Sequence, residues 1–186
     1  MVIKTASPLV VFKSSIIEVT VYLDAIDHAE SRWYDHPNKT GFCGVDMKEI
    51  TLCYMTRELC HQFLREHDIH WLPVNPEDII IQHRNWKLKY VHQVAYEIGK
   101  DEQYVLDHVM RSQDGLSMYD VKVDKYDILI NASDDKPPGR ILWTKMHEIG
   151  HIYLGHLRDN HLTKIIKEEL PPELYEQMEF EADMFA

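Results

Sequence analysis

Ten residues of the chain, His147 to His156, read HEIGHIYLGH, in which His147, Glu148 and His151 form the pattern H-E-x-x-H. Histidines four residues apart lie on one face of an α-helix, so both imidazoles can bind one metal ion from the same side. A glutamate beside the first histidine can reach the open side of that metal and act as a general base. The pattern therefore predicts a Zn²⁺ site with Glu148 as the base.

The sequence around this pattern is typical of a helix. Apolar side chains recur at helical spacings, and a break precedes them at residues 137–139; the apolar positions are Ile141, Leu142, Met146, Ile149, Ile152 and Tyr153. Because the chain has 12 histidines in 186 residues, two solvated histidines on an amphipathic helix are the alternative. A suitable third ligand further along the chain would favour the metal site.

A catalytic zinc site has three protein ligands and one position open to water. In the metzincin pattern the third ligand is a histidine six residues after the second one, but here that position is Leu157, and Leu154 replaces the expected glycine. The other common ligand is a carboxylate on a later helix. Residues 171–186, PPELYEQMEFEADMFA, begin with two prolines and then contain no helix breaker, which predicts such a helix.

On this helix Glu179 and Asp183 are four residues apart and share a face. Glu179 can bind the metal while Asp183 accepts a hydrogen bond from a ligating imidazole and fixes its orientation. Glu181 is the competing ligand, and it lies about 200° from Glu179 around the helix, so only one of the two can face the metal. We favour Glu179, because that choice also gives Asp183 a function. A solvated acidic face is the alternative for both.

The two segments HEIGHIYLGH and EFEADMFA resemble the HExGHxxLGH and ExEAxxFA blocks of the ImmA/IrrE family of metallopeptidases. The strand-like YDILINAS and the residues DGLS, Asp114 to Ser117, also fit that family. The resemblance covers about residues 114–186, and NPEDIII at Asn75 to Ile81 is similar to the family's N-terminal opening. Family members usually continue beyond the FA, whereas this sequence stops at Ala186, and residues 1–70 have no counterpart.

The resemblance implies a gluzincin-type, zinc-dependent intracellular endopeptidase that cleaves a helix-turn-helix repressor or another regulatory protein. It assigns His147, His151 and Glu179 as ligands and Glu148 as the catalytic base. A different class of function is a non-catalytic zinc-binding module that sequesters a regulatory partner. Glu148 favours the enzyme, because a structural zinc site needs no base.

The composition restricts the partners and the location. A net charge of −11 argues against direct binding to nucleic acid, which needs a basic face, and permits a basic protein partner. The sequence has no apolar stretch of the ~18 residues that would span a membrane and no signal peptide. Cys43, Cys53 and Cys60 are an odd set without paired spacing, so we expect no disulfide framework and a cytoplasmic protein.

Two strands are predicted before the H-E-x-x-H helix, at residues 118–123 and 126–132, and they would form an antiparallel hairpin. We expect the second strand, with Tyr126, Ile128 and Ile130, to be the sheet edge that holds an extended peptide substrate by strand addition. The residue that stabilises the oxyanion stays open among four candidates, which are Tyr153, His156, His161 and Tyr175. For His156 a structural or solvated role is favoured, because it lies about 180° from His147 on a continuous helix.

The rest of the chain is predicted to be mostly helical. Residues 1–70 would form an appendage made of a strand at 16–23, a loop at 28–46 and a helix from Asp46 to about His67. Residues 71–186 would form the peptidase domain, opening with a helix capped by Asn75 and continuing as helices to Ser112 with breaks at 85–86 and Gly99. The predicted fold class is α+β and zincin-like, with a small antiparallel sheet packed on the H-E-x-x-H helix.

Overall fold

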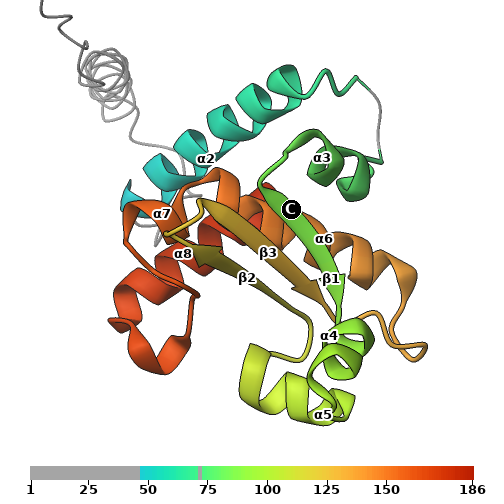
Figure 1. The fold of residues 1–186 in the computed structure, drawn as a ribbon. Helices are drawn as coiled ribbons and strands as arrows, with labels where there is room; N and C mark the ends of the chain where they lie inside the picture. Colours follow the sequence, from blue (N-terminus) through green and yellow to red (C-terminus); the bar gives the residue numbers. More distant parts are fainter. Residues whose placement is uncertain (1–46, 71–72) are drawn as a thin grey trace, which may run out of the picture. The chain divides into compact units, whose positions relative to one another are not determined.

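The computed structural model describes residues 47–70 and 73–186, so the strand predicted at 16–23 and the loop predicted at 28–46 lie outside the described residues (Figure 1). Helices surround one small three-stranded sheet, which confirms the α+β class. Among the described helices, none is long and apolar enough to cross a membrane.

The sheet consists of β1 (Trp86–Tyr90), β2 (Gly115–Asp120) and β3 (Lys125–Ile130), in the order β1-β3-β2. The pair β2 and β3 is antiparallel, as predicted, whereas β1 runs parallel to β3, so the sheet is mixed. The residues just after 86 were expected to be helical, and this prediction is wrong, because they form β1. Its sequence WKLKY alternates apolar and basic residues, which is the strand period, over a stretch too short to stand out.

The predicted substrate edge is also wrong. Tyr126, Ile128 and Ile130 belong to β3, which is the central strand and pairs with β1 on one side and β2 on the other. Its backbone donors and acceptors are therefore already used and cannot pair with a peptide. The side chains of these three residues are instead buried in the hydrophobic core.

The H-E-x-x-H helix is α6 (Pro138–Tyr153), which packs against β2 and β3 (Figure 1). It begins after Pro137, with a proline at its first position, and it buries Ile149 and Ile152 in the core. The helix predicted at 171–186 is α8 (Pro172–Phe185), which packs against α6. A Cβ atom on Gly150 would lie 3.1 Å from Cδ1 of Phe185, so this glycine allows the two helices to approach closely.

The helix predicted from Asp46 to about His67 is α2 (Met47–Glu66), and it packs against α8. Phe63 is almost fully buried, and its ring centroid lies 4.8 Å from that of Phe185 and 4.8 Å from that of Tyr153. Residues 46–186 form one compact unit, so α2 shares a core with the helices of the site although the sequence placed it in the N-terminal appendage. The boundary at residue 70 and the role of residues 1–70 stay predictions.

Short helices complete the fold, and several begin or end where the sequence predicts. Asn75 accepts a hydrogen bond from the backbone N–H of Glu77 and so caps α3 (Pro76–Gln82), while Gly99 ends the helix α4 in a left-handed conformation. The helix predicted from Asp101 to Ser112 consists of α5 (Glu102–Tyr104) and the π-helix η2 (Val105–Met110). The bounds of the remaining helices are Val91–Ile98 for α4, His156–Asp159 for α7 and Lys167–Glu169 for η3.

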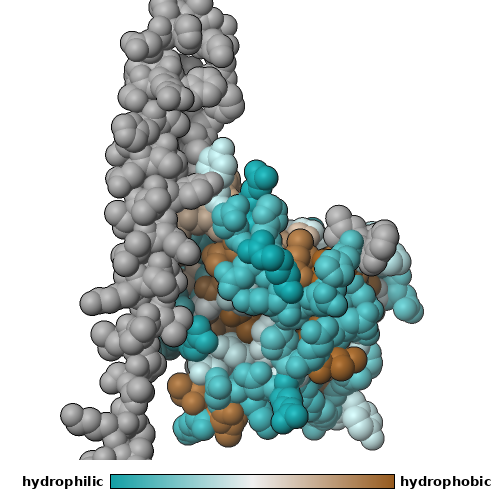
Figure 2. All heavy atoms as spheres, turned by 90° about the horizontal axis from the view of Figure 1, so that it is seen from above, coloured by the Kyte–Doolittle hydropathy of each residue, from teal (hydrophilic) through white to brown (hydrophobic). Residues whose placement is uncertain are grey.

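A polar cluster fixes α6 against the elements that precede it in the sequence. Lys145, which is buried on α6, donates hydrogen bonds to Oε1 of Glu77 on α3 at 2.5 Å and to the hydroxyl of Tyr90 on β1 at 3.1 Å. Hydrogen bonds from Lys145 and Tyr90 lower the pKa of the Glu77 carboxyl. On the face that Figure 2 shows, the coloured residues are mostly hydrophilic, with small separate hydrophobic patches.

Candidate metal centre

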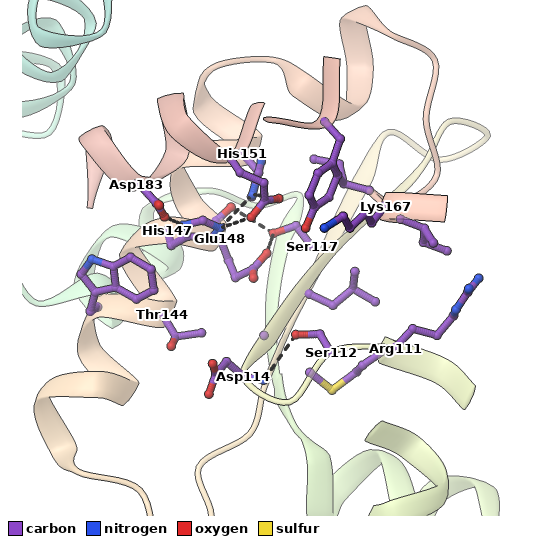
Figure 3. A pocket seen from close by; sticks show the side chains of 18 of the residues that line it. Arg111, Ser112, Asp114, Ser117, Thr144, His147, Glu148, His151, Lys167 and Asp183 are labelled. Carbon is purple, nitrogen blue, oxygen red and sulfur yellow. Dashed lines mark hydrogen bonds and ion pairs between the residues drawn. The ribbon is translucent and has the colours of Figure 1, made fainter. Parts of the chain in front are cut away.

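The three residues of the H-E-x-x-H pattern lie in the buried half of α6 (Figure 3). His147 and His151 are one helical turn apart, and their Nε2 atoms are 3.0 Å from each other. Both rings therefore direct the same nitrogen at one point, as the spacing predicts.

Helix α8 brings a carboxylate to this point. Oε1 of Glu179 lies 3.5 Å from Nε2 of His151, and Oε2 lies 3.6 Å from Nε2 of His147. The candidate ligand atoms of the three residues all lie within 4.8 Å of one another. Two ligand atoms about 2.1 Å from a tetrahedral zinc are about 3.4 Å apart. The donor set and its spacing therefore fit Zn²⁺, with one side of the site left to the pocket.

The charges of these groups also suit a cation. Burial lowers the pKa of the His151 imidazole well below its ordinary value and also lowers that of His147, which keeps lone pairs available on the neutral rings. Burial, assisted by the charge of Asp183, raises the pKa of Glu179 to about 7. Burial raises the pKa of Glu148 to about 8, opposed by hydrogen bonds from Ser117 and assisted by the charge of Glu179. A cation between these groups would offset the desolvation and repulsion of the two carboxylates.

Asp183 lies where the sequence predicts, beside His147. Its Oδ1 atom is 2.9 Å from Nδ1 of His147, and its side chain is 55% exposed. The two atoms are close, but their alignment does not make a hydrogen bond, because Nδ1 of His147 is a buried nitrogen without a hydrogen-bond partner among the described residues. The predicted hydrogen bond from a ligating imidazole to Asp183 is therefore not formed, and the contact is a close approach of the carboxylate to the His147 ring at the mouth of the site.

Glu181, the competing ligand, points away from the site. Its Oε2 atom lies 2.7 Å from Nε2 of His156, and Nδ1 of His156 lies 2.9 Å from Nδ1 of His151. His156 is thus buried, and it contacts the Nδ1 side of the candidate ligand His151. It is neither solvated nor a direct metal ligand. This position exists because α6 ends at Tyr153 and Gly155 turns the chain with a φ of 77°.

Glu148 lies against β2, whose residues leave room for its carboxylate. The Ser117 hydroxyl lies 2.8 Å from Oε2 of Glu148 and can donate a hydrogen bond to it; it also lies 3.0 Å from the backbone carbonyl of the same residue. A Cβ atom on Gly115 would lie only 2.7 Å from Oε1 of Glu148 and 2.7 Å from Cγ2 of Thr144. Any side chain at position 115 would therefore displace the glutamate.

The candidate metal centre opens into a pocket of about 490 Å³, and Figure 3 shows its walls. Of the four residues considered for oxyanion stabilisation, Tyr175 lines this pocket. Tyr153 instead donates a hydrogen bond to Glu66 at 2.7 Å, and His156 is engaged between His151 and Glu181. His161 is not among the residues that line the pocket.

Residues 103–186 match the family model of the IrrE N-terminal-like domain, a peptidase family. This part of the chain is similar to an IrrE N-terminal-like domain. The match confirms the resemblance to the ImmA/IrrE family and indicates a metallopeptidase type of function. It spans η2, the hairpin of β2 and β3, α6 and α8, which supply all the residues of the candidate site. No curated protein and no solved structure matches the chain.

Sequence reasoning missed three features of the IrrE-like domain. It assigned no role to Ser117 or Gly115, although both belong to the DGLS segment that resembles the family. It treated Glu181 and His156 separately, because they are 25 residues apart and nothing local pairs them. The glycine before His156 was the available signal, since a glycine at a helix end commonly reverses the chain direction.

Proposed function

We propose that the protein is a zinc-dependent endopeptidase with Glu148 as its general base, acting on a helix-turn-helix repressor or another regulatory protein. The observation that supports this proposal is the convergence of His147, His151 and Glu179 at tetrahedral spacing, with Glu148 beside them in a pocket. The peptidase family of the IrrE-like domain supports the same class of reaction.

Bound Zn²⁺ would supply a Lewis acid and would lower the pKa of a bound water toward neutrality. Glu148 takes the proton from the attacking water and later delivers it to the nitrogen of the leaving amine. The Ser117 hydroxyl orients the Glu148 carboxylate through Oε2, and Gly115 leaves space for Oε1. Tyr175, which lies one helical turn before Glu179 on α8, is our candidate for donating a hydrogen bond to the oxyanion.

The substrate would bind along β2 and not along the buried strand β3. β2 is an edge strand of the sheet, and its Gly115 and Ser117 line the pocket beside Glu148. The backbone N–H of Tyr119 donates to the carbonyl of Thr163 at 2.8 Å, which covers the far end of that edge. An extended peptide can pair with the end near Gly115 and place its scissile carbonyl next to Glu148.

The proposed regulatory substrate rests on the family resemblance and on charge. The net charge of −11 suits a partner with a basic surface, such as a DNA-binding repressor. The sequestering module without catalysis is the competing interpretation, and it differs in one measurable respect, because it requires a stable complex and no product.

The test combines metal analysis with incubation of the purified protein and the helix-turn-helix protein encoded by a neighbouring gene. We expect bound zinc and discrete cleavage fragments. The variant Glu148→Gln should keep the zinc and lose cleavage by about 10²–10⁴-fold, as for loss of a general acid–base group. A stable complex without fragments would support sequestration, and full activity of Glu148→Gln would exclude the assigned base.

A further inference from the structure

The side of His151 that faces away from Glu179 is in contact with two buried polar residues. Nδ1 of His151 lies 2.9 Å from Nδ1 of His156, and Nε2 of His156 lies 2.7 Å from Oε2 of Glu181. The side chains of His156 and Glu181 are only 5% and 16% exposed. The second oxygen of Glu181 accepts a hydrogen bond from Nε2 of Gln177 at 2.9 Å. These contacts form a continuous chain from α8 through α7 to α6.

The chain of contacts has one proton arrangement when His156 is neutral. A carboxylate only accepts hydrogen bonds, so Nε2 of His156 must carry the proton that is donated to Glu181. Nδ1 of His156 then has a lone pair and accepts from His151, which therefore carries its own proton on Nδ1. The Nε2 atom of His151 is left with its lone pair, and this is the atom that lies 3.5 Å from Glu179.

We propose that His156 and Glu181 are positioning residues that hold His151 in its Nδ1–H tautomer and aim its Nε2 atom at the metal. The proposal rests on the metal site of the proposed function, but the tautomer is a property of the protein chain without metal. It gives Glu181 a structural connection to the site although Glu181 faces the opposite side of α8 from Glu179.

The local structure explains how one short helix can carry two glutamates with different tasks. Two residues correspond to about 200° around a helix, so Glu179 faces the pocket and Glu181 faces α7. Gly155 adopts a left-handed conformation, and α7 begins at the next residue, which returns His156 toward α6. A buried polar pair is costly to desolvate, and the usual function of such a partner behind a ligating histidine is to fix the ring.

The decisive measurement is the tautomer of His151 in metal-free protein labelled with ¹⁵N-histidine, at about pH 8, where ordinary imidazoles are neutral. Long-range ¹H–¹⁵N spectra should show His151 protonated on Nδ1. The variant His156→Leu removes the acceptor, so His151 should move toward the Nε2–H form or a mixture. In His156→Asn the side-chain oxygen lies near the position of Nδ1, so the Nδ1–H form of His151 should be restored at least in part.

Zinc affinity, measured by competition with a chelator, gives the second readout. We expect His156→Leu and Glu181→Ala to bind zinc about 10–100-fold more weakly than the unmodified protein, with partial recovery in His156→Asn. The control is His108→Leu, which replaces an exposed histidine of η2 whose Nδ1 atom faces the carbonyl of Tyr104 and which is not among the residues that line the pocket. This control should leave both the His151 tautomer and the affinity unchanged.

The outcomes separate this proposal from the proposed function. If the unmodified protein binds zinc but His156→Leu keeps the same His151 tautomer and affinity, the positioning role is wrong and the metallopeptidase proposal stands. If the unmodified protein binds no zinc, the proposed function fails, while the metal-free spectra still decide the tautomer. If His156→Leu does not fold, Glu181→Ala replaces it, and an unchanged His151 tautomer and zinc affinity in that variant would equally exclude the positioning role.

Discussion

The two histidines of the candidate metal centre lie one turn apart on the same helix, yet the Nδ1 atoms of their rings are in contact with different kinds of residue. His147 is in contact with Asp183, whose side chain is 55% exposed at the mouth of the pocket. His151 is in contact with His156, whose side chain is 5% exposed and which continues to Glu181 in the interior. We call these the Asp183 contact and the His156–Glu181 chain.

The difference has a physical consequence. Water can reach Asp183 and can replace it as a partner of His147, and salt screens an exposed charge. No solvent reaches His156 in comparable amount, so removing a member of the His156–Glu181 chain leaves a buried polar group without a partner. We therefore expect the buried chain to matter more for stability and for metal binding than the exposed contact.

The largest expected effect is a loss of zinc affinity, which should be greater when the ligand Glu179 is removed than when Glu181 of the buried chain is removed. Glu179→Ala removes a candidate ligand, so its zinc affinity should fall by more than about 100-fold, the upper range for a residue that only orients a ligand. Glu181→Ala should fall within that range, because it acts only through His156. Isothermal titration or chelator competition on both variants measures this difference. A greater loss of affinity in Glu181→Ala than in Glu179→Ala would show that Glu179 is not the ligand.

A substitution in β2 tests the placement of the general base, which involves neither of the two contacts. In Gly115→Ala the new Cβ atom collides with Oε1 of Glu148, so the carboxylate must move. Misplacing a catalytic group by about 1 Å can lower the rate about 100-fold. We expect that loss in kcat for cleavage, with zinc affinity unchanged, because neither His147 nor His151 is displaced. If the rate is retained, the carboxylate does not need the space over Gly115.

The next comparison concerns the stability of the metal-free protein. Glu181→Ala leaves Nε2 of the buried His156 without its acceptor, so the free energy of unfolding should fall by about 1–3 kcal/mol. The matched change Asp183→Ala removes a half-exposed side chain and should alter stability by less than about 0.5 kcal/mol. Urea denaturation followed by circular dichroism measures both. Equal effects would show that burial does not distinguish the two contacts.

The smallest effect is expected for Asp183→Asn, which removes the charge and keeps the size. Zinc affinity should decrease by about 10-fold, at the lower end of the range for a partner of a ligating histidine. Raising the salt concentration should reduce the difference between Asp183→Asn and the unmodified protein, because Asp183 is exposed. Affinity measured at two ionic strengths tests this, and a loss that does not depend on salt would contradict the screened contact.

Local rules in the sequence predicted several parts of the fold. The four-residue spacing placed His147 and His151 together, because residues one turn apart share a face. Asn75 and Pro76 marked the start of α3, because a side-chain cap and a proline satisfy the first helical turn locally. The strand β1 was missed, because its five residues pair with a strand about 40 residues later and have too short a pattern of their own.

The sequence by itself determined which residues could form the candidate site, since spacing on α6 and on α8 sets the faces that carry His147, His151, Glu179 and Asp183. Only the tertiary structure decided how the two helices face each other, which of Glu179 and Glu181 meets the histidines, and which strand is exposed at the pocket. These outcomes depend on packing between residues distant in the sequence, such as Ser117 with Glu148 and His156 with Glu181. No local periodicity encodes them.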